Sequence, residues 1–397
     1  FYPDLPKGYQ TTQMYQPIIL AGYVDVPLED GSLVRVRVHH AHMEEDAGKL
    51  THYGDHSLVD LNRAGTPLIE IVSEPDIHSA AAAKAYATEL YRLMTYAGVT
   101  HGDLYHGNMR FDVNISIAPK GAAELGKRAE VKNLNSFRSV ERAAEYEFRR
   151  QVELIEKGER VVQETRGWDD AKQRTSSQRS KEDAQDYRYM PDADIPPIVL
   201  SSEEIASIQA EVPALPSEYR AKWANLALDK SVVNSLLAKR QYAELIGSIQ
   251  DIAGDSAAKR VAHWFASALS LGSDDSETNT GIVLTDNAVQ DLTILATMTE
   301  ANEISSTAAK EIFNDLVSGV TDPRAIAESK NLLQVSDEGS VAAVVDEVLA
   351  DPASARAIED IRAGNDKAIG YLVGQIMKKS AGKANPALAQ KLIKERI

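Results

Sequence analysis

The sequence predicts an α+β fold, in which a mixed sheet with a few helices is followed by helices alone. Up to about residue 212, short apolar or alternating segments are separated by glycine and proline turns, which is typical of strands. Beyond it, almost every segment has the apolar spacing of a helix. With 397 residues, the chain also exceeds a single hydrophobic core. We therefore expect an α+β domain over residues 1–212, an all-α helical domain over 213–327 and a small α-helical tail over 328–397.

Changes in composition place these boundaries. The sequence changes from mixed to helical at a cluster of prolines: Pro191, Pro196, Pro197, Pro213 and Pro216. The polar segment 272–281 is of low complexity, which predicts a surface loop between helices. Ser336, followed by two acids, is typical of a helix start and opens the last set of helices.

The first expected element is a β-hairpin. Residues 22–26 and 34–38 have alternating side chains and flank the Asp30-Gly31 step, which is a turn signal between strands. Further strands are expected at 68–72, 109–116, 130–134 and 161–166.

Two helices are expected in the same domain. The first runs from 79 to 96 and has Gly98 after its end. The second follows Ser136, which is placed to cap it. Its expected core-facing stripe consists of Phe137, Val140, Ala144, Phe148, Val152 and Ile155.

An acid-rich stretch carries the candidate chemistry. Three acids at 44–46 follow the hairpin, and Glu70 lies within the apolar strand at 68–72. An ionised carboxylate in a buried strand needs a cation or strong donors opposite it, and a metal ion is the natural partner. Because Mg²⁺ binds hard oxygen ligands and keeps several waters, two carboxylates suffice, and we expect them from Glu45 and Glu70. The alternative is a solvated turn at 44–46 and a salt bridge from Glu70 to Arg63.

The expected strand at 109–116 carries further functional groups. Alternation places Arg110, Asp112 and Asn114 on one face and apolar residues on the other. We expect these three side chains to contact a nucleotide cofactor.

Three histidines, His39, His40 and His42, precede the acids. They lack the four-residue spacing of helical zinc pairs, so an ordinary strand end or loop is favoured over a zinc site. A stand-alone metal hydrolase that uses His39, His42 and Glu45 stays open as an alternative.

Composition excludes several classes of site. The absence of cysteine excludes disulfides, cysteine nucleophiles and thiolate zinc sites. The net charge of −16 argues against general affinity for nucleic acid, so RNA would bind through local basic patches. No run of about 18 apolar residues is present, so we expect no membrane span. No P-loop, kinase glycine loop or serine nucleophile signature occurs.

Several long segments resemble the GatB family, whose members are subunits of the tRNA-dependent amidotransferase. They are FYPDLPKGYQ, MEEDAGK, SLVDLNRAGTPLIEIVSEPD, EVKNLNSFRSVERAAEYE, VVQETRGWDD, DYRYMPDADIPP and GYLVGQIMKKSAGKANP. The resemblance covers essentially the whole chain and implies a cradle-like first domain and a YqeY-like tail. It implies a cytoplasmic ligase that uses ATP and Mg²⁺ to amidate Glu-tRNA(Gln) or Asp-tRNA(Asn), with ammonia that a partner amidase releases from glutamine.

The same resemblance implies partners and roles. The amidase GatA and the small protein GatC would complete a heterotrimer that binds misacylated tRNA. Lys7 and Glu45 match residues that gate an ammonia channel. In the tail, Lys378, Lys379 and Lys383 are expected to bind tRNA. The family pattern also has, before the position of Phe1, a segment whose Glu-x-His pair completes the magnesium site. A non-catalytic tRNA-docking subunit or fragment is therefore the alternative function.

Overall fold

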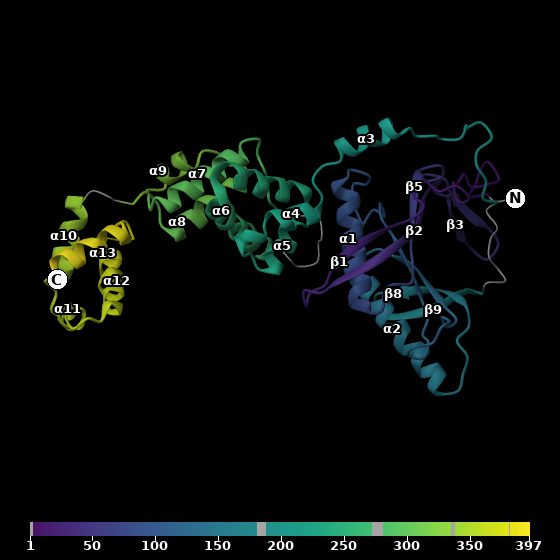
Figure 1. Ribbon diagram of the computed structural model, residues 1–397, viewed down its shortest axis with the longest axis horizontal. Helices are drawn as coiled ribbons and strands as arrows, with labels where there is room; N and C mark the ends of the chain where they lie inside the picture. Colours follow the sequence, from purple (N-terminus) through teal and green to yellow (C-terminus); the bar gives the residue numbers. More distant parts are fainter. Residues whose placement is uncertain (1–2, 181–187, 272–280, 335–337, 381) are drawn as a thin grey trace. The chain divides into compact units, whose positions relative to one another are not determined.

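The computed structural model describes residues 3–180, 188–271, 281–334, 338–380 and 382–397. The chain divides into two compact units, Phe1–Leu215 and Pro216–Ile397. All strands among the described residues lie in the first unit, and the second consists of helices and loops (Figure 1). The α+β class is therefore confirmed. The finer division at residue 328 stays a prediction, and the expected cap Ser336 lies outside the described residues.

The first sheet is antiparallel, with three strands in the order β1-β2-β5. β1 (Gly22–Pro27) and β2 (Leu33–Glu45) form the expected hairpin. Its turn is closed by Asp30, whose Oδ1 accepts hydrogen bonds from the backbone nitrogen and the hydroxyl of Ser32. β5 (Pro67–Ser73) pairs with the far half of β2 and places Glu70 opposite His42.

β2 is much longer than the strand expected at 34–38. It has 13 residues and ends at Glu45. The three histidines and two of the acids therefore lie inside a strand, and the interpretation of this stretch as a strand end, loop or solvated turn is wrong. Its pairing with β5 satisfies the backbone groups of this second half and so extends the strand. A shift in register between Val38 and His40 marks a β-bulge.

In the sequence, a second hairpin follows β2 and precedes β5, where no strand was expected. It consists of β3 (Lys49–His52) and β4 (Ser57–Asp60), which form a separate two-stranded sheet. β5 is a strand as predicted, but the side chain of Glu70 is 51% exposed and Ile69 is also exposed. The expectation of a buried strand is wrong because β5 lies at an edge of its sheet.

The second sheet is mixed, with the order β6-β7-β8-β9. Its strands are β6 (Phe111–Ile115), β7 (Ala129–Leu134), β8 (Glu164–Asp169) and β9 (Arg174–Ser180). β7 and β8 are parallel, and the two outer pairs are antiparallel. β9 was not expected, because its sequence RTSSQRS has no apolar alternation.

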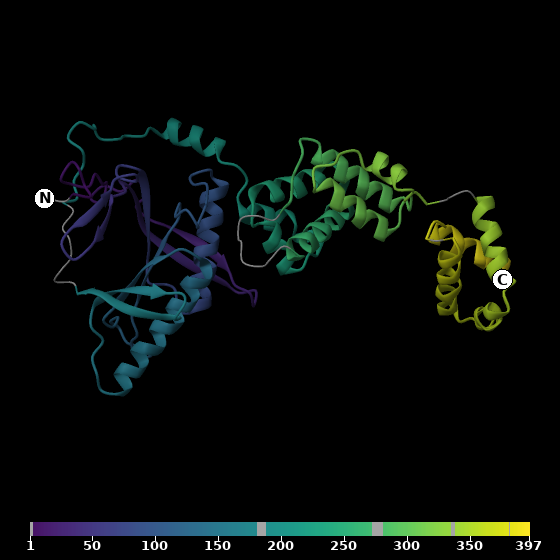
Figure 2. The same cartoon turned by 180° about the vertical axis from the view of Figure 1, so that it is seen from behind.

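Two helices, α1 (Ala80–Tyr96) and α2 (Phe137–Glu156), lie against each other, and α2 lies against this sheet (Figures 1 and 2). The expected cap is confirmed, because Ser136 accepts a hydrogen bond from the backbone of Ser139. Ser79, which was expected to be the first residue of its helix, is also a cap and accepts a hydrogen bond from the backbone of Ala82. The shared core consists of Ala87, Val131, Leu134, Val140 and Ala143.

The inner face of α2 is partly charged. Val140 and Ala144 are buried as predicted, but Phe148 and Ile155 are each 51% exposed. Glu147 and Gln151 are fully buried instead. The expected apolar stripe is wrong at these positions, because this side of the helix meets Arg166 of β8, with Arg150 of α2 itself beside it.

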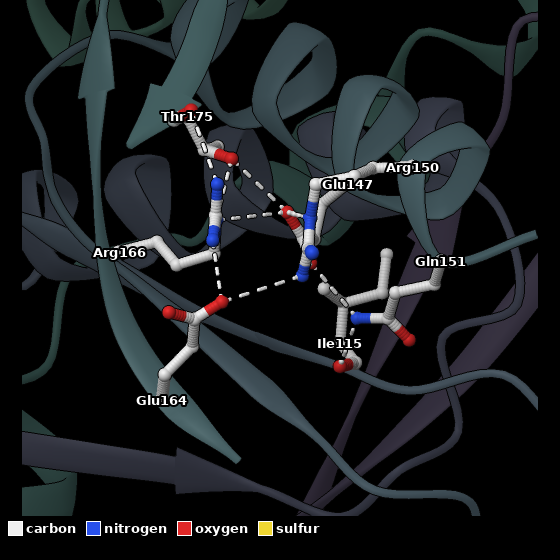
Figure 3. A network of polar contacts seen from close by, with 7 residues as sticks. All are labelled: Ile115, Glu147, Arg150, Gln151, Glu164, Arg166 and Thr175. Carbon is white, nitrogen blue, oxygen red and sulfur yellow. Dashed lines mark hydrogen bonds and ion pairs between the residues drawn. The ribbon is translucent and has the colours of Figure 1, made fainter. Parts of the chain in front are cut away.

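Figure 3 shows the partners of Glu147. Its carboxylate accepts hydrogen bonds from Arg150 Nε at 2.9 Å and from Thr175 Oγ1 at 3.1 Å. Arg166 of β8 lies 3.5 Å from the same carboxylate and also contacts Thr175 and Glu164. Two arginines thus balance two glutamates, and the network ties the helix to the sheet.

The first unit ends with α3 (Ser202–Glu211), which begins with a capping box of Ser201 and Glu204 and contains no buried residue. The second unit contains the following helices, of which those labelled η are 3₁₀ turns: α4 (Pro216–Lys222), η2 (Ala224–Leu226), α5 (Lys230–Leu236), α6 (Arg240–Leu271), α7 (Ala288–Glu300), α8 (Ser306–Leu316), α9 (Pro323–Ser329), α10 (Glu338–Leu349), η3 (Pro352–Ser354), α11 (Ala355–Arg362), η4 (Asp366–Ala368), α12 (Ile369–Lys379) and α13 (Pro386–Arg396).

Aromatic and aliphatic residues form the cores of this unit. Phe265 of α6 packs on Phe313 of α8, with ring centroids 5.3 Å apart. Further along the chain, Val345, Leu372 and Ile393 belong to a core built by α10 to α13. No helix in the described part of the chain combines the length and the apolar character that crossing a membrane requires.

Candidate functional site

The centre of the candidate site is a cluster of three side chains on one face of the first sheet: His42, Glu44 and Glu70. His42 and Glu44 are two residues apart in β2, so they point to the same side, and Glu70 lies opposite His42 in β5. His42 Nε2 is 3.2 Å from Glu44 Oε2 and 3.4 Å from Glu70 Oε2. One possible ligand atom from each residue lies within 4.8 Å of the other two.

The electrostatics of this cluster favour a bound cation. Burial, together with the neighbouring carboxylates of Glu70 and Asp46, raises the pKa of Glu44 to about 7. His42 is fully buried, and its Nδ1 has no hydrogen-bond partner among the described residues. Two carboxylates and one imidazole nitrogen at these distances therefore fit a divalent cation, which would offset both the burial of the Glu44 charge and its repulsion by the neighbouring carboxylates.

Glu45 lies outside this cluster. As the next residue along β2 after Glu44, it points to the opposite face of the strand. There its Oε1 lies 2.7 Å from Lys7 Nζ and accepts a hydrogen bond of 2.9 Å from the backbone nitrogen of Thr11. Burial alone would raise the pKa of Glu45, but the contacts with Lys7 and Thr11 outweigh it and lower the pKa.

The expected metal pair of Glu45 and Glu70 is thus corrected. The structure brings Glu70 together with Glu44 and His42, whereas it brings Glu45 together with Lys7. The strand alternation is the physical reason, because it separates two consecutive acids onto two faces. The pairing of Lys7 with Glu45 agrees with the expectation that these two residues act together.

Asp46 follows the strand and holds two arginines. Its Oδ2 lies 3.0 Å from Arg63 Nε and 3.1 Å from Arg110 Nη2. The alternative salt bridge between Glu70 and Arg63 is therefore wrong, because Arg63 pairs with Asp46. The sequence analysis did not predict this group of Asp46, Arg63 and Arg110. Asp46 and Arg63 lie in segments on which the family resemblance rests, and Arg110 directly precedes β6.

The exposed face of the second sheet carries polar groups. Asp112 and Asn114 are exposed on β6, and Asn114 lies opposite Glu130 of β7. Lys132 Nζ lies 3.6 Å from Asp112 and 3.4 Å from Glu130. Burial disfavours the charge of Lys132, but the two acids outweigh it and raise its pKa. Arg110 precedes the strand and contacts Asp46, whereas Asp112 contacts Lys132. The three residues predicted to bind the cofactor therefore do not contact the same neighbours.

The remaining histidines lie beside the cluster but outside it. The ring of His40 stacks on that of His42, with centroids 5.1 Å apart, and His39 Nδ1 is 2.6 Å from His40 Nδ1. The hydrolase set of His39, His42 and Glu45 is not brought together, because His42 groups with Glu44 and the side chain of Glu45 lies on the other face.

In the tail, Lys378 and Lys379 lie in the last turn of α12, where their charge complements the helix dipole. Both are exposed, and Lys383 is half-buried. Lys379 Nζ contacts Glu347, so part of the basic charge of the tail is already paired within the chain.

A groove of about 580 Å³ lies between the start of α1, the outer side of α2 and Trp168. None of the residues predicted for the site lines it.

Comparison with known proteins identifies relatives of the whole chain. A profile of the GatB/GatE catalytic domain matches residues 1–206, and a profile described as the GatB domain matches residues 248–397. The chain is 45% identical over 406 residues to the B subunit of the aspartyl/glutamyl-tRNA(Asn/Gln) amidotransferase of Alkalilimnicola ehrlichii, which covers all of this chain and 83% of that protein. Proteins of the same name from Persephonella marina and Pseudomonas aeruginosa are 42% and 43% identical, over all of this chain and 82% and 83% of theirs.

Proposed function

The chain belongs to the GatB family, and on that premise we propose how its residues take part in the reaction. It is one component of a tRNA-dependent amidotransferase, a ligase of several subunits that uses ATP and acts in protein biosynthesis. The roles of individual residues, the metal and the other partners are proposals.

The proposed reaction has two steps. The side-chain carboxylate of the glutamyl or aspartyl residue on tRNA attacks the γ-phosphorus of ATP, so that a carboxylate–phosphorus bond forms and the bond to ADP breaks. Ammonia then attacks the acyl carbon, the amide bond forms, and phosphate leaves with the proton that ammonia loses. The protein needs to position these groups and stabilise negative charge, and it forms no covalent bond itself.

The proposed metal ligands are Glu70, Glu44 and His42. A Mg²⁺ ion held there would neutralise charge on the phosphate groups. The observation that carries this proposal is the raised pKa of Glu44 in a cluster whose ligand atoms lie within 4.8 Å of one another. The carboxylates of Glu44 and Glu70 would fix the position of the ion, and the buried ring of His42 would exclude water from the inner side of the cluster.

Lys7 and Glu45 are proposed to guide ammonia toward the acyl carbon. Lys7 Nζ contacts both Glu45 and the hydroxyl of Thr11, at 2.7 Å and 2.6 Å, so donors and acceptors alternate along this short path. The lowered pKa of Glu45 keeps its carboxylate ionised and able to accept a hydrogen bond.

Nucleotide and tRNA contacts complete the proposal. Asp112, Asn114 and Arg110 would contact the nucleotide, and Lys378, Lys379 and Lys383 the tRNA backbone. Ammonia would come from the amidase GatA, in a cytoplasmic heterotrimer with the small protein GatC, and the substrate would be Glu-tRNA(Gln) or Asp-tRNA(Asn).

Co-purification with candidate GatA and GatC proteins, followed by transamidation of each misacylated tRNA, tests the proposal. Glu70→Gln in that complex should remove most ATP cleavage that depends on misacylated tRNA, while tRNA affinity stays nearly unchanged. Glu159→Gln, in an exposed loop, is the matched control. ATP cleavage at the normal rate in a folded Glu70→Gln complex would show that the metal assignment is wrong. Tight tRNA binding without any ATP cleavage in the parent complex would support the docking-subunit alternative.

A further inference from the structure

Arg63 and Arg110 converge on one oxygen atom. Both guanidinium groups contact Oδ2 of Asp46, at 3.0 Å and 3.1 Å, although the two arginines are far apart in the chain. The side chain of Asp46 is only 14% exposed, whereas those of Arg63 and Arg110 are 44% and 39% exposed. The carboxylate is therefore the inner, fixed member of the trio, and the arginines form its outer surface.

The backbone holds this arrangement in place. The nitrogen of Asp46 donates to the carbonyl of Thr66 at 2.8 Å, and its carbonyl accepts from Gly65 at 2.9 Å. These two bonds fix the loop that carries Arg63 beside the end of β2. Arg63 Nη2 donates to the carbonyl of Gly107 at 3.3 Å, which fixes the loop that leads to Arg110. Three segments are thus joined at this point.

Two positive charges share one negative charge within this trio. Each guanidinium has five N–H donors. Among the described residues, their polar contacts use Nε and Nη2 of Arg63 and Nη2 of Arg110. Within the described part of the chain the remaining donors have no hydrogen-bond partner, so they and one positive charge are available to an anion. A planar guanidinium fork matches the oxygen spacing of a phosphate group.

The trio adjoins the metal cluster. Asp46 lies two residues beyond Glu44 and close enough to act electrostatically on its carboxylate. A cation site and a pair of guanidinium groups therefore stand beside each other at the end of β2. This combination suits a phosphate chain that is neutralised by a metal ion on one side and by arginines on the other.

We propose that Arg63 and Arg110, held by Asp46, bind the terminal phosphoryl group of a nucleoside triphosphate. The inference rests on the proposed function and supplies the phosphate contacts that no P-loop provides in this sequence. The arginines donate hydrogen bonds to the outer oxygens of the phosphoryl group while it passes from ADP to the carboxylate. A tRNA backbone phosphate offers the same chemistry, but it has no need of the adjoining cation cluster.

The test uses the complex with GatA and GatC and the variants Arg63→Gln and Arg110→Gln. The probes are ADP and the non-hydrolysable triphosphate AMP-PNP, each with Mg²⁺, measured by calorimetry. Because charge-assisted bonds to the terminal group are lost, we expect AMP-PNP to bind about tenfold or more weakly in each variant. ADP lacks that group, so its affinity should change by less than about threefold. ATP cleavage should fall by about 100-fold or more.

Two further variants guard the interpretation. Arg35→Gln removes an arginine that pairs with Asp25 on the outer hairpin, and it should leave both affinities unchanged. Arg63→Lys keeps the charge but not the fork, so it should recover part of the AMP-PNP affinity and little of the cleavage rate.

The outcomes separate the possible roles. Normal AMP-PNP binding in both glutamine variants would overturn the inference. Normal AMP-PNP binding with weaker tRNA binding, and a smaller dependence of tRNA affinity on salt, would overturn it in favour of a tRNA phosphate. If the parent complex cleaved no ATP with any misacylated tRNA, the proposed function would fail. A selective loss of AMP-PNP affinity in the variants would still support the phosphate contact.

Discussion

Replacing Glu44 by glutamine isolates the effect of one buried carboxyl group in the metal cluster. The pKa of this group is about 7 in the folded chain and has an ordinary value of 4.5. Between these two pH values the folded chain binds more protons at Glu44 than the unfolded chain does. Stability therefore falls as pH rises through this window, by about 3 kcal/mol if the unfolded pKa is ordinary. Glutamine has the same shape and no charge, so this dependence should disappear.

Two results follow for the variant. In EDTA and above pH 7, Glu44→Gln should unfold at a higher denaturant concentration than the parent, by up to about 3 kcal/mol in free energy. Metal binding should change in the opposite sense, because a ligand is lost. In the parent, a cation must displace a proton below pH 7, so the Mn²⁺ dissociation constant should rise by about tenfold per pH unit there and be flat above. In the variant it should be higher and should lose the part of the pH dependence that Glu44 supplies.

The assay is denaturant unfolding in EDTA over a pH series, paired with Mn²⁺ titration by calorimetry at the same pH values. Glu159→Gln again serves as the control, because its carboxyl group lies in an exposed loop. The reasoning is refuted if the parent and Glu44→Gln show the same dependence of stability on pH. It is also refuted if Mn²⁺ binds the parent equally well at about pH 6 and at pH 8.

Three other changes test separate parts of the molecule. Lys7→Ala should depress transamidation with glutamine, while glutaminase turnover and ATP cleavage continue, and high external ammonium should restore product; equal product from glutamine would eliminate the guiding role. The double change Lys378→Ala with Lys383→Ala should weaken tRNA binding and lower the salt slope by up to about two, whereas Lys330→Ala should not, and an unchanged slope would leave these lysines as helix-end charges. Glu147→Ala leaves the buried charges of Arg150 and Arg166 without their carboxylate, so the free energy of unfolding should fall by about 3–5 kcal/mol, and a loss below about 1 kcal/mol would mean that water replaces it.

The sequence predicts those elements whose signals are local. The Asp-Gly turn between β1 and β2, the cap Ser136, and the change to helices after the proline cluster all depend on neighbouring residues. β9 escapes prediction because a strand of small and charged residues is stabilised by its pairing with β8, which no local pattern reports.

The candidate site depends on strand length more than on composition. The acids at 44–46 are visible in the sequence, but the choice between Glu44 and Glu45 as the partner of Glu70 requires knowing that β2 continues to residue 45. The alternation of side chains along the strand then places Glu44, and not Glu45, on the face of His42 and Glu70. In α2, the spacing of apolar residues indicated Phe148 as inward, yet Glu147 is buried because Arg150, Arg166 and Thr175 satisfy its charge. Long-range partners of this kind leave no periodic signal.

The alternation of side chains along β2 restricts how this part of the chain can vary in length. An insertion or deletion of one residue between His42 and Glu45 would exchange the two faces, turning the proposed cation ligand toward Lys7 and the partner of Lys7 toward Glu70. A change of two residues would keep the faces but shift both functions along the strand. The extra residue that the strand does contain, at the bulge between Val38 and His40, lies ahead of this run. Length variation should therefore be accepted in the β3–β4 hairpin and rejected in the segment from His42 to Glu45.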